Sequence, residues 1–492
     1  MVEPGMYSLA PVAVTLAIAL AARNVLAGLF AGVLTGAAML SDASLLQFFP
    51  ELVSGWLVPE VADSYNASIL VLLAFIGGFV KLIETSGGGM AFARSAIRWV
   101  KGPIRAQIAA WCGGIMIFFS DLGTPLIVGP VFQSLMDRLR VSRQKLAFIL
   151  DSTSSPVCIL IPFIGWGVFI MSVLADAFTA NDIDQSEWDA FIEAIPFQFY
   201  AWLAIAIVPL LAMLKFDYGP MRAVESDITR APAAVPVQIE TGSQAKPVLV
   251  WLPLLVLFVV LFATLAAHGF PFSQVAGSDF RAGLSAAYFL AAVMLVLLTL
   301  LMRVQDLSQS MSQYINGVSG MMPIAATLVL AWALGAVSEG LGTGTYVAEL
   351  ARGGLPGSLL PAITFVLAAV ISFATGSSWG TIIIMIPLAV PAAIATAAPM
   401  PVVVGAVLSG GLFGDHSSPV SETTILSATG AGTTTLEHFR TQLPYALTNG
   451  AIAFGGFLLA GHLPVAWIAL PILLAQAMVL LALRRLQRRV QH

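Results

Sequence analysis

The stretch that decides the fold is residues 401–424, PVVVGAVLSGGLFGDHSSPVSETT, in which an apolar run passes directly into a polar segment. The run 401–413 is too short to cross a bilayer, which takes about 20 apolar residues. Its glycines, and the proline in the polar segment, favour a broken helix. The polar segment contains Asp415, His416 and Glu422 among several hydroxyl side chains. Such groups are costly inside a membrane and are usually functional there.

The composition of the whole chain is that of a membrane protein. Of its 492 residues, 58% are hydrophobic and 10% are charged, and the mean hydropathy is +0.92. Globular domains have about 25% charged residues, and a soluble chain of this composition would expose large apolar patches. These values exclude a nucleic-acid binder, a secreted disulfide scaffold and a soluble enzyme. Cys112 and Cys158 lie in apolar stretches and are interpreted as small buried hydrophobes.

Lysine and arginine are distributed unevenly and predict the topology. Of 22 such residues, nineteen fall on one side of the membrane if the apolar segments alternate across it. They are Arg23, Arg303, Arg440 and four groups: Arg94, Arg98, Lys101 and Arg105; Arg138, Arg140, Arg143 and Lys145; Lys215, Arg222, Arg230 and Lys246; Arg484, Arg485, Arg488 and Arg489. The positive-inside rule predicts an external N-terminus, a cytoplasmic C-terminus and a flexible cytoplasmic loop over 215–246. Segment 105–137 then leaves and re-enters on one side, as two short helices or a re-entrant hairpin.

The sequence divides into six segments, two of which look like repeats. Ser154-Ser155-Pro156-Val157 recurs as Ser417-Ser418-Pro419-Val420, and Gly123-Thr124 recurs as Gly380-Thr381, at nearly one offset. The charge distribution gives the two copies opposite directions, which is the inverted-repeat pattern of secondary transporters. The segments are an N-terminal two-helix segment (1–67), the first repeat (68–214), the linker (215–246), connecting helices (247–319), the second repeat (320–442) and C-terminal helices with a basic tail (443–492).

Four polar segments interrupt the apolar runs at equivalent places in the repeats: 120–125, 151–156, 375–381 and 414–424. Their glycines and prolines free backbone carbonyls, and their hydroxyl and carboxylate oxygens suit a hard cation such as Na⁺. The candidate proton- or cation-coupling residues are Asp121, Asp415, His416 and Glu422. The candidate ion-binding residues are Thr124, Asp151, Ser152, Thr153, Ser154, Thr375, Ser377, Ser378, Thr381, Ser417, Ser418 and Thr423. We expect Asp121, Ser378 and Asp415 to bind Na⁺, and Asp121, Ser154, Ser378 and Asp415 to line one cavity near the bilayer centre.

A purely structural role is the alternative for many of these side chains. Serine and threonine in apolar helices often bond only to the carbonyl four residues earlier. Glu84 and Glu339 lie near span ends, where an interfacial position is favoured. The remaining histidines are interpreted as bystanders near span ends or the terminus, namely His268, His438, His462 and His492. His416 differs from them because it follows Asp415 within an apolar run.

Enzyme motifs are absent or weak in the sequence. There is no H-E-x-x-H and no phosphate-binding loop. Residues 317–320, GVSG, match an intramembrane serine pattern but have no evident partner histidine, and Asp415 lacks a convincing second carboxylate for an aspartyl protease. We therefore expect no enzyme and no cofactor, and we expect an ion gradient to drive transport.

Three motifs resemble the NhaC family of Na⁺/H⁺ antiporters. Residues 414–427, GDHSSPVSETTILS, resemble the family's GDHCSPISDTTILS, and residues 373–381, FATGSSWGT, resemble its FATGTSWGT. Residues 137–147 with 151–153 resemble its DRLRISREKLAYIVDST. The sequence departs from the family at Ser417, where Cys is usual, at Glu422, where Asp is usual, and at Ser120-Asp121, where two aspartates are common.

These observations predict an all-α polytopic membrane protein with two inverted repeats, broken or re-entrant helices and roughly 11–13 spans. The expected location is the inner membrane of a prokaryote. The predicted activity is exchange of Na⁺ for H⁺, with Asp121, Asp415 and Glu422 as exchangeable carboxylates and His416 as a proton partner. The alternative is a Na⁺- or H⁺-coupled carrier of an organic acid or amino acid, because relatives in the resembled family include malate and lactate exchangers. The expected partners are these solutes and the lipid bilayer. No nucleic acid is expected as a partner, and whether the protein forms a homodimer is left open.

Overall fold

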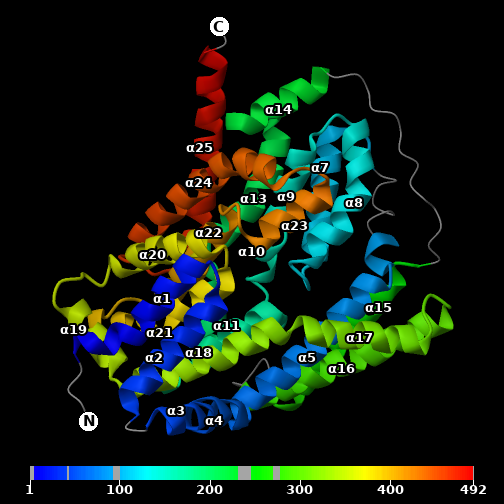
Figure 1. The fold of residues 1–492 in the computed structure, drawn as a ribbon. Helices are drawn as coiled ribbons and strands as arrows, with labels where there is room; N and C mark the ends of the chain where they lie inside the picture. The colour runs from blue at the N-terminus through cyan, green and yellow to red at the C-terminus, as the bar shows by residue number, and fades with distance from the viewer. Residues whose placement is uncertain (1–4, 42–43, 92–99, 231–244, 270–276, 491–492) are drawn as a thin grey trace.

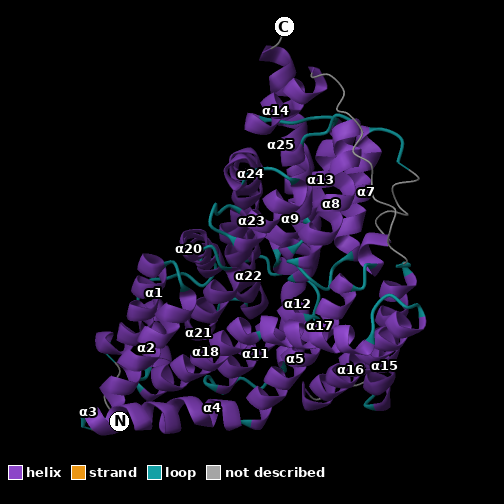
Figure 2. Cartoon of the chain, turned by 45° about the vertical axis from the view of Figure 1, so that its right-hand side comes forward, coloured by secondary structure: helices purple, strands orange, loops and turns teal. Residues whose placement is uncertain are grey.

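A computed structural model describes residues 5–41, 44–91, 100–230, 245–269 and 277–490, and throughout these residues the chain is helical, with no strand (Figures 1 and 2). The helices up to the linker are α1 (Ala10–Ala22), α2 (Val25–Leu40), α3 (Leu45–Glu51), α4 (Val58–Ala62), α5 (Ser64–Thr85), α7 (Pro103–Met116), α8 (Gly123–Arg138), α9 (Arg143–Ser152), α10 (Ser155–Cys158), α11 (Gly165–Thr179), α12 (Glu187–Ala194) and α13 (Phe199–Leu214). Those that follow are α14 (Gly219–Arg230), α15 (Val248–Ala267), α16 (Gly277–Leu301), α17 (Leu307–Gly320), α18 (Met322–Gly340), α19 (Thr343–Arg352), α20 (Leu360–Thr375), α21 (Ser378–Thr396), α22 (Met400–His416), α23 (Glu422–Ala431), α24 (Thr435–Ala460) and α25 (Ala469–Val490). The predicted all-α class is confirmed for this part of the chain.

Seven helices among the described residues are long and apolar enough to cross a membrane, or eight if α12 and α13, bent by 46°, form one span. Four shorter apolar helices accompany them, over residues 6–22, 25–40, 165–179 and 360–375. The chain is therefore an integral membrane protein with a broken helix pair. The predicted number of crossings stays a prediction, because helices interrupted at polar segments each cover only part of the bilayer thickness.

Helix α22 lies at the centre of the bundle. It packs against α20 and α21 and also against α12, α13 and α24. Helices α8 and α9 pack against α23, while α5, α16 and α17 form a group with α15 at another edge (Figure 1). Segments from both halves of the chain thus meet around α22, which ends at the polar segment containing Asp415.

Helices α8 and α23 connect the two halves of the chain, and their backbones are in direct contact. A Cβ atom at Gly129 would lie 2.3 Å from the carbonyl oxygen of Gly430, and one at Gly430 would lie 2.3 Å from that of Pro125. No side chain fits in either place, so the approach requires glycine at both positions. Close contact between small residues is a common way for helices to pack in membranes, where lipid tails are as apolar as leucine.

Segment 105–137 forms the two short helices α7 and α8, joined by a turn and packed against each other, as one of the two predicted alternatives has it. The C-terminal end of α25 and the helices α3 and α4 lie at opposite ends of the molecule (Figure 1). The placement of the two termini on opposite sides of a membrane stays a prediction. Which side is cytoplasmic remains a prediction.

The linker needs a correction, because its first part is not a flexible loop. Residues 219–230 form helix α14, and Met221 on that helix is fully buried. The segment lacks a long apolar run, so its sequence did not predict a helix. The few apolar residues of this helix pack on the bundle. Residues 231–244 of the predicted loop, and Arg94 and Arg98 of the first basic group, lie outside the described residues.

Candidate functional site

Capping residues fix the helix ends at the polar segments of the second half. Helix α20 ends where Gly376 takes a φ of +68°, a conformation that glycine adopts without strain. Helix α21 begins after Ser377, whose Oγ accepts a hydrogen bond from the Gly380 N–H at 3.2 Å. Helix α23 begins after Ser421, whose side chain accepts from the Thr424 N–H. The predicted breaks are therefore present and are built by the residue types that predicted them.

The first half contains matching breaks. Helix α9 begins after Ser142, whose Oγ accepts from the Lys145 N–H at 3.0 Å, and it ends at Ser152. Three residues later, at Ser155, the single turn α10 begins, with Pro156 among its first residues. Proline has no N–H to donate and suits the first turn of a helix. The Ser-Ser-Pro motif thus starts a new helical turn directly after a polar helix end.

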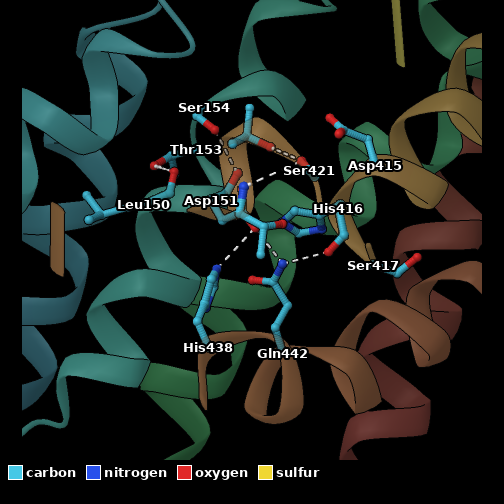
Figure 3. A network of polar contacts seen from close by, with 12 residues as sticks. Leu150, Asp151, Thr153, Ser154, Asp415, His416, Ser417, Ser421, His438 and Gln442 are labelled. Carbon is cyan, nitrogen blue, oxygen red and sulfur yellow. Dashed lines mark hydrogen bonds and ion pairs between the residues drawn. The ribbon is translucent and has the colours of Figure 1, made fainter. Parts of the chain in front are cut away.

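Asp151, at the end of α9, is the centre of a buried polar network (Figure 3). Its Oδ2 lies 2.5 Å from Nε2 of Gln442, 3.2 Å from Nε2 of His438 and 3.6 Å from Nε2 of His416. The Gln442 amide also donates to the backbone carbonyl of His416 at 2.7 Å. We call Asp151, His416, His438, Gln442 and Tyr200 the Asp151 cluster. It joins a carboxylate of the first repeat to helices α22 and α24.

His416 is held from two sides within this cluster. The Tyr200 hydroxyl lies 2.8 Å from Nδ1, and both side chains are buried. If the hydroxyl donates to Nδ1, a neutral imidazole has its proton on Nε2, which faces Asp151. Nε2 has no hydrogen-bond partner in the part of the chain that is described. An Nε2 proton on this ring therefore points toward Asp151 without forming a hydrogen bond.

Ser378 and Asp415 form a second buried contact, which we call the Asp415 pair. The Ser378 Oγ donates to Asp415 Oδ2 at 2.9 Å and lies 3.4 Å from the backbone carbonyl of Gly411. Ser378 is fully buried and Asp415 is 5% exposed. The pair joins the start of α21 to the end of α22. It places a carboxylate, a hydroxyl and a backbone carbonyl within a few ångströms of one another. Oxygen atoms of these kinds are ligands for hard cations.

Asp121, in the turn between α7 and α8, has its own set of donors. Its Oδ2 accepts from Trp166 Nε1 at 2.9 Å and from Ser155 Oγ at 3.4 Å, and its Oδ1 accepts from the Leu122 N–H at 3.0 Å. The ring centroids of Trp166 and Trp379 are 4.7 Å apart. Since Trp379 follows Ser378 in the chain, the two rings connect Asp121 to the Asp415 pair.

Most of the other predicted hydroxyls bond locally. Those that donate to carbonyls of their own or a neighbouring turn are Thr124, Thr153, Ser154, Thr375, Thr381 and Ser417. Ser418 donates to the Phe373 carbonyl of α20 at 2.8 Å, and Thr423 lies 3.0 Å from Ser421 Oγ. These bonds satisfy the hydroxyls without a ligand, so the structural alternative is favoured for this group.

Two predicted residues have contrasting surroundings. Ser152 is fully buried, and its Oγ has no hydrogen-bond partner among the described residues. Glu422 is exposed in the first turn of α23, where a negative charge suits the positive end of the helix dipole. An exposed carboxylate at a helix start is explained by the helix itself, and its part in coupling stays a prediction.

The structure brings Ser378 and Asp415 into contact, but it gives Asp121 and Ser154 other partners. Ser154 Oγ donates to the backbone carbonyl of Asp151 at 3.2 Å. Within the described ranges no group of three or more His, Cys, Asp or Glu residues is arranged to hold a metal ion. The predicted Na⁺ site of Asp121, Ser378 and Asp415 thus consists of a direct pair and a more distant carboxylate.

Several residues of the site were missed in the sequence, and one interpretation needs correcting. His438 lies near the start of α24, as predicted, but it is no bystander there, because it is fully buried beside Asp151. Tyr200 and Trp166 carry no local signal, since each lies on an apolar helix. The available signal was the spacing of His438 and Gln442. These residues are four positions apart and therefore lie on one face of a helix.

Comparisons with known proteins agree with this architecture. The sequence profile described as the Na⁺/H⁺ antiporter family matches residues 157–462. An uncharacterized protein of Haemophilus influenzae is 33% identical over 477 residues, which cover 93% of this chain and 91% of that protein. The malate-2H⁺/Na⁺-lactate antiporter of Bacillus subtilis is 36% identical over 107 residues, 20% of this chain and 22% of that protein. The crystal structure of the Alcanivorax borkumensis YdaH transporter has a similar fold, with a TM-score of 0.59 and 15% identity over 86% of this chain and 89% of that one.

Proposed function

The chain belongs to the Na⁺/H⁺ antiporter family, and from that membership we propose that it exchanges Na⁺ for H⁺ at the Asp415 pair. The family makes it a secondary transporter rather than an enzyme. The finer proposal concerns which ions are carried and where they bind. It rests on one observation above all, the buried contact of 2.9 Å between Ser378 Oγ and Asp415 Oδ2 where two helices are interrupted.

The chemistry of the pair couples the two ions. An ionised carboxylate in a low-dielectric interior is strongly unfavourable unless a cation or proton neutralises it. Asp415 can accept either one, and occupancy by Na⁺ excludes occupancy by H⁺ on the same oxygens. Ser378 Oγ and the Gly411 carbonyl supply further oxygen ligands when Na⁺ is bound. Exchange then follows because release of one ion is needed before the other binds.

The Asp151 cluster supports the pair from the neighbouring residue. His416 directly follows Asp415, and its ring is held by Tyr200 at 2.8 Å and faces Asp151 at 3.6 Å. An imidazole in this position can take a proton that leaves Asp415 and pass it on. We assign His416 this proton-partner role and assign Asp151 the role of orienting the ring.

The test is transport by the purified protein in proteoliposomes. An inward Na⁺ gradient should drive protons outward in wild-type vesicles, measured with a pH-sensitive dye, and Asp415→Asn should abolish this flux. Asp182→Asn is the matched control, because Asp182 is an exposed carboxylate with a left-handed φ of 52° that asparagine also adopts. Na⁺-dependent proton flux at the wild-type rate in Asp415→Asn would contradict the proposal.

A second candidate function is coupled transport of an organic acid. The similarity to a protein named as a malate-2H⁺/Na⁺-lactate antiporter favours it. The starts of α8 and α10, whose N-cap residues form no side-chain capping bond, and the hydroxyl groups at the breaks are suited to hold a carboxylate group of such a solute. The same vesicles discriminate the two functions. Na⁺-driven proton flux that requires added malate or lactate supports the organic-acid carrier, whereas flux without them supports simple Na⁺/H⁺ exchange.

A further inference from the structure

A cavity of about 900 Å³ lies at the end of the molecule formed by α14 and the C-terminal part of α25 (Figure 2). Residues of α7, α13, α14 and α25 line it, and no member of the Asp151 cluster or of the Asp415 pair does. Pockets for small ligands have volumes of about 300–1,000 Å³. This cavity, which we call the basic pocket, is thus large enough for a ligand and separate from the proposed exchange site.

The charge of the basic pocket is strongly positive. Its cationic side chains are Lys101, Arg105, Arg140, Lys215 and Arg222. Its two carboxylates are already engaged elsewhere. Asp217 forms an ion pair with the buried Lys145 and accepts a hydrogen bond from Tyr445. Glu225 accepts from the Ser142 N–H at 2.9 Å, and burial raises the pKa of the Glu225 carboxyl.

Three of the cations have no internal partner. Lys101, Arg105 and Lys215 are exposed, and they form no ion pair with any residue in the described ranges. Like charges gathered around one cavity repel each other. The positive-inside rule accounts for cations on this side of the membrane, and their convergence on one cavity places several of them within reach of a single anion.

The start of α7 adds backbone donors to the same pocket. This 14-residue helix follows Gly102, which has no side chain to cap it, and begins with Pro103. The N–H groups of Ile104 and Arg105 are therefore left for another acceptor, at the positive end of the helix dipole. Gln107, one turn later, lines the pocket and is 9% exposed, and its Oε1 has no hydrogen-bond partner among the described residues. Gln107 is thus a buried side chain at the wall of the pocket whose oxygen no residue in the described ranges satisfies.

The backbone of one lysine is held in a conformation that costs stability. Lys215 directly follows α13 with a φ of 49°, in the left-handed region. Glycine is the usual residue at such a helix end, because a Cβ atom is strained there. The same left-handed conformation follows α1 at Arg23 and α21 at Ala397, so at Lys215 it identifies glycine as a substitution that the backbone accepts.

We propose that the basic pocket binds a phosphate-bearing anion, with the start of α7, Lys101, Arg105 and Lys215 as its ligands. Helix starts combined with cationic side chains are a recurrent phosphate site in proteins. Apolar side chains, among them Leu211 and Phe216, line the rest of the pocket. The phosphate group is accordingly either that of a soluble compound or the headgroup of an anionic phospholipid whose chains pack on this apolar wall.

Native mass spectrometry of the intact protein in a non-ionic detergent tests the proposal and separates the two sources. Inorganic pyrophosphate represents the soluble anion, dioctanoyl phosphatidylglycerol represents the lipid, and dioctanoyl phosphatidylcholine is the neutral control. Lys101→Gln combined with Lys215→Gln should weaken binding of the anion at least tenfold. Arg352→Gln, which removes a cation at the end of α19 far along the chain from the pocket, should leave binding unchanged.

Lys215→Gly keeps the test independent of folding. It removes a charge and relieves the left-handed backbone, so we expect a higher melting temperature together with weaker anion binding. Pyrophosphate binding identifies a soluble ligand, and binding of phosphatidylglycerol alone identifies a lipid headgroup. The proposal is overturned if neither anion binds more tightly than phosphatidylcholine, or if the lysine variants bind as the wild type does.

Discussion

The break between α9 and α10 and the break between α22 and α23 share the sequence Ser-Ser-Pro-Val, yet they hold their carboxylates in different ways. When the two motifs are aligned, Ser152 stands at the position of Asp415. Aligning the two Gly-Thr pairs places Asp121 at the position of Ser378. Each half therefore has one serine and one aspartate at these two places, but in exchanged order.

Only in the second half are the serine and the aspartate hydrogen-bonded to each other. Ser378 donates to Asp415 at 2.9 Å, whereas Asp121 bonds to Trp166 and Ser152 Oγ has no partner among the described residues. In the first half the carboxylate with several partners is that of Asp151. Its Oδ2 lies 2.5–3.6 Å from nitrogen atoms of three side chains of the second half. A carboxylate with many fixed nitrogen donors suits the anchoring of helices, whereas Asp415 is held by the hydroxyls of Ser378 and Ser421, which can also stay beside a bound cation. The comparison teaches that similar motifs place their carboxylates among different partners, and under the proposed function the first half anchors while the second exchanges.

The largest expected effect is that of Asp415→Asn on transport. The amide keeps the shape of the side chain but can neither neutralise Na⁺ nor release a proton, so we expect Na⁺-driven proton flux to fall at least a hundredfold, or about 2.7 kcal/mol. Proteoliposomes with matched protein content provide the measurement. An Asp151→Asn variant with the greater loss per folded molecule would reverse the assignment of roles.

Asp151→Asn should act on stability instead. Removing the charge leaves the donors of His438 and Gln442 poorly matched in a buried site, which costs about 2–3 kcal/mol of unfolding free energy. The melting temperature of the purified protein, followed by size-exclusion chromatography after heating, gives the comparison with wild type. We expect the protein that remains folded to keep at least a tenth of wild-type flux. An unchanged melting temperature would show that Asp151 is no anchor.

Ser378→Ala should have an intermediate effect. The variant removes the hydroxyl that donates to Asp415 Oδ2 at 2.9 Å and leaves the hydrogen bond from Ser421 in place. A hydrogen bond to a charged group is worth about 1.5–3 kcal/mol, so we expect the Na⁺ concentration for half-maximal flux to rise roughly tenfold. Thr381→Val is the matched control, because the Thr381 hydroxyl bonds only to the Ser377 carbonyl. Equal Na⁺ dependence in the two variants would remove Ser378 from the site.

Ser152→Ala should have the smallest effect, although Ser152 stands at the position of Asp415. A buried hydroxyl without a partner stabilises nothing, so its loss should change neither the melting temperature nor the flux by more than about twofold. The result sharpens the comparison, because Ser378→Ala and Ser152→Ala each remove one serine hydroxyl, in the second and in the first half. A loss at Ser152 as large as at Ser378 would indicate that both halves bind the ion.

The sequence predicted the breaks well because their causes are local. Glycine, proline and capping serine act within one turn, so Gly376, Ser377 and Ser421 could be recognised from their neighbours alone. Asp415 was recognised for a related reason, since a charge in an apolar run is conspicuous without any structure. The fold class followed from composition in the same way.

The partners of Asp151 could not be predicted, because they come from distant parts of the chain. His438 and Gln442 lie nearly 290 residues from Asp151 and sit on a regular helix whose buried face depends on what packs against it. Helix α14 was missed for a related reason, as its stability comes from burying Met221 rather than from a long apolar run. Polar residues on a helix reveal their role only when the opposing surface is known.

Proton release on Na⁺ binding tests the central claim most directly. Purified protein in weakly buffered detergent solution is titrated with NaCl, and the pH is followed with an indicator dye against choline chloride as the ionic-strength control. We predict that Na⁺ releases protons from the wild type and from Ser152→Ala, and that it releases none from Asp415→Asn. Equal proton release from Asp415→Asn and wild type would contradict exchange at the Asp415 pair.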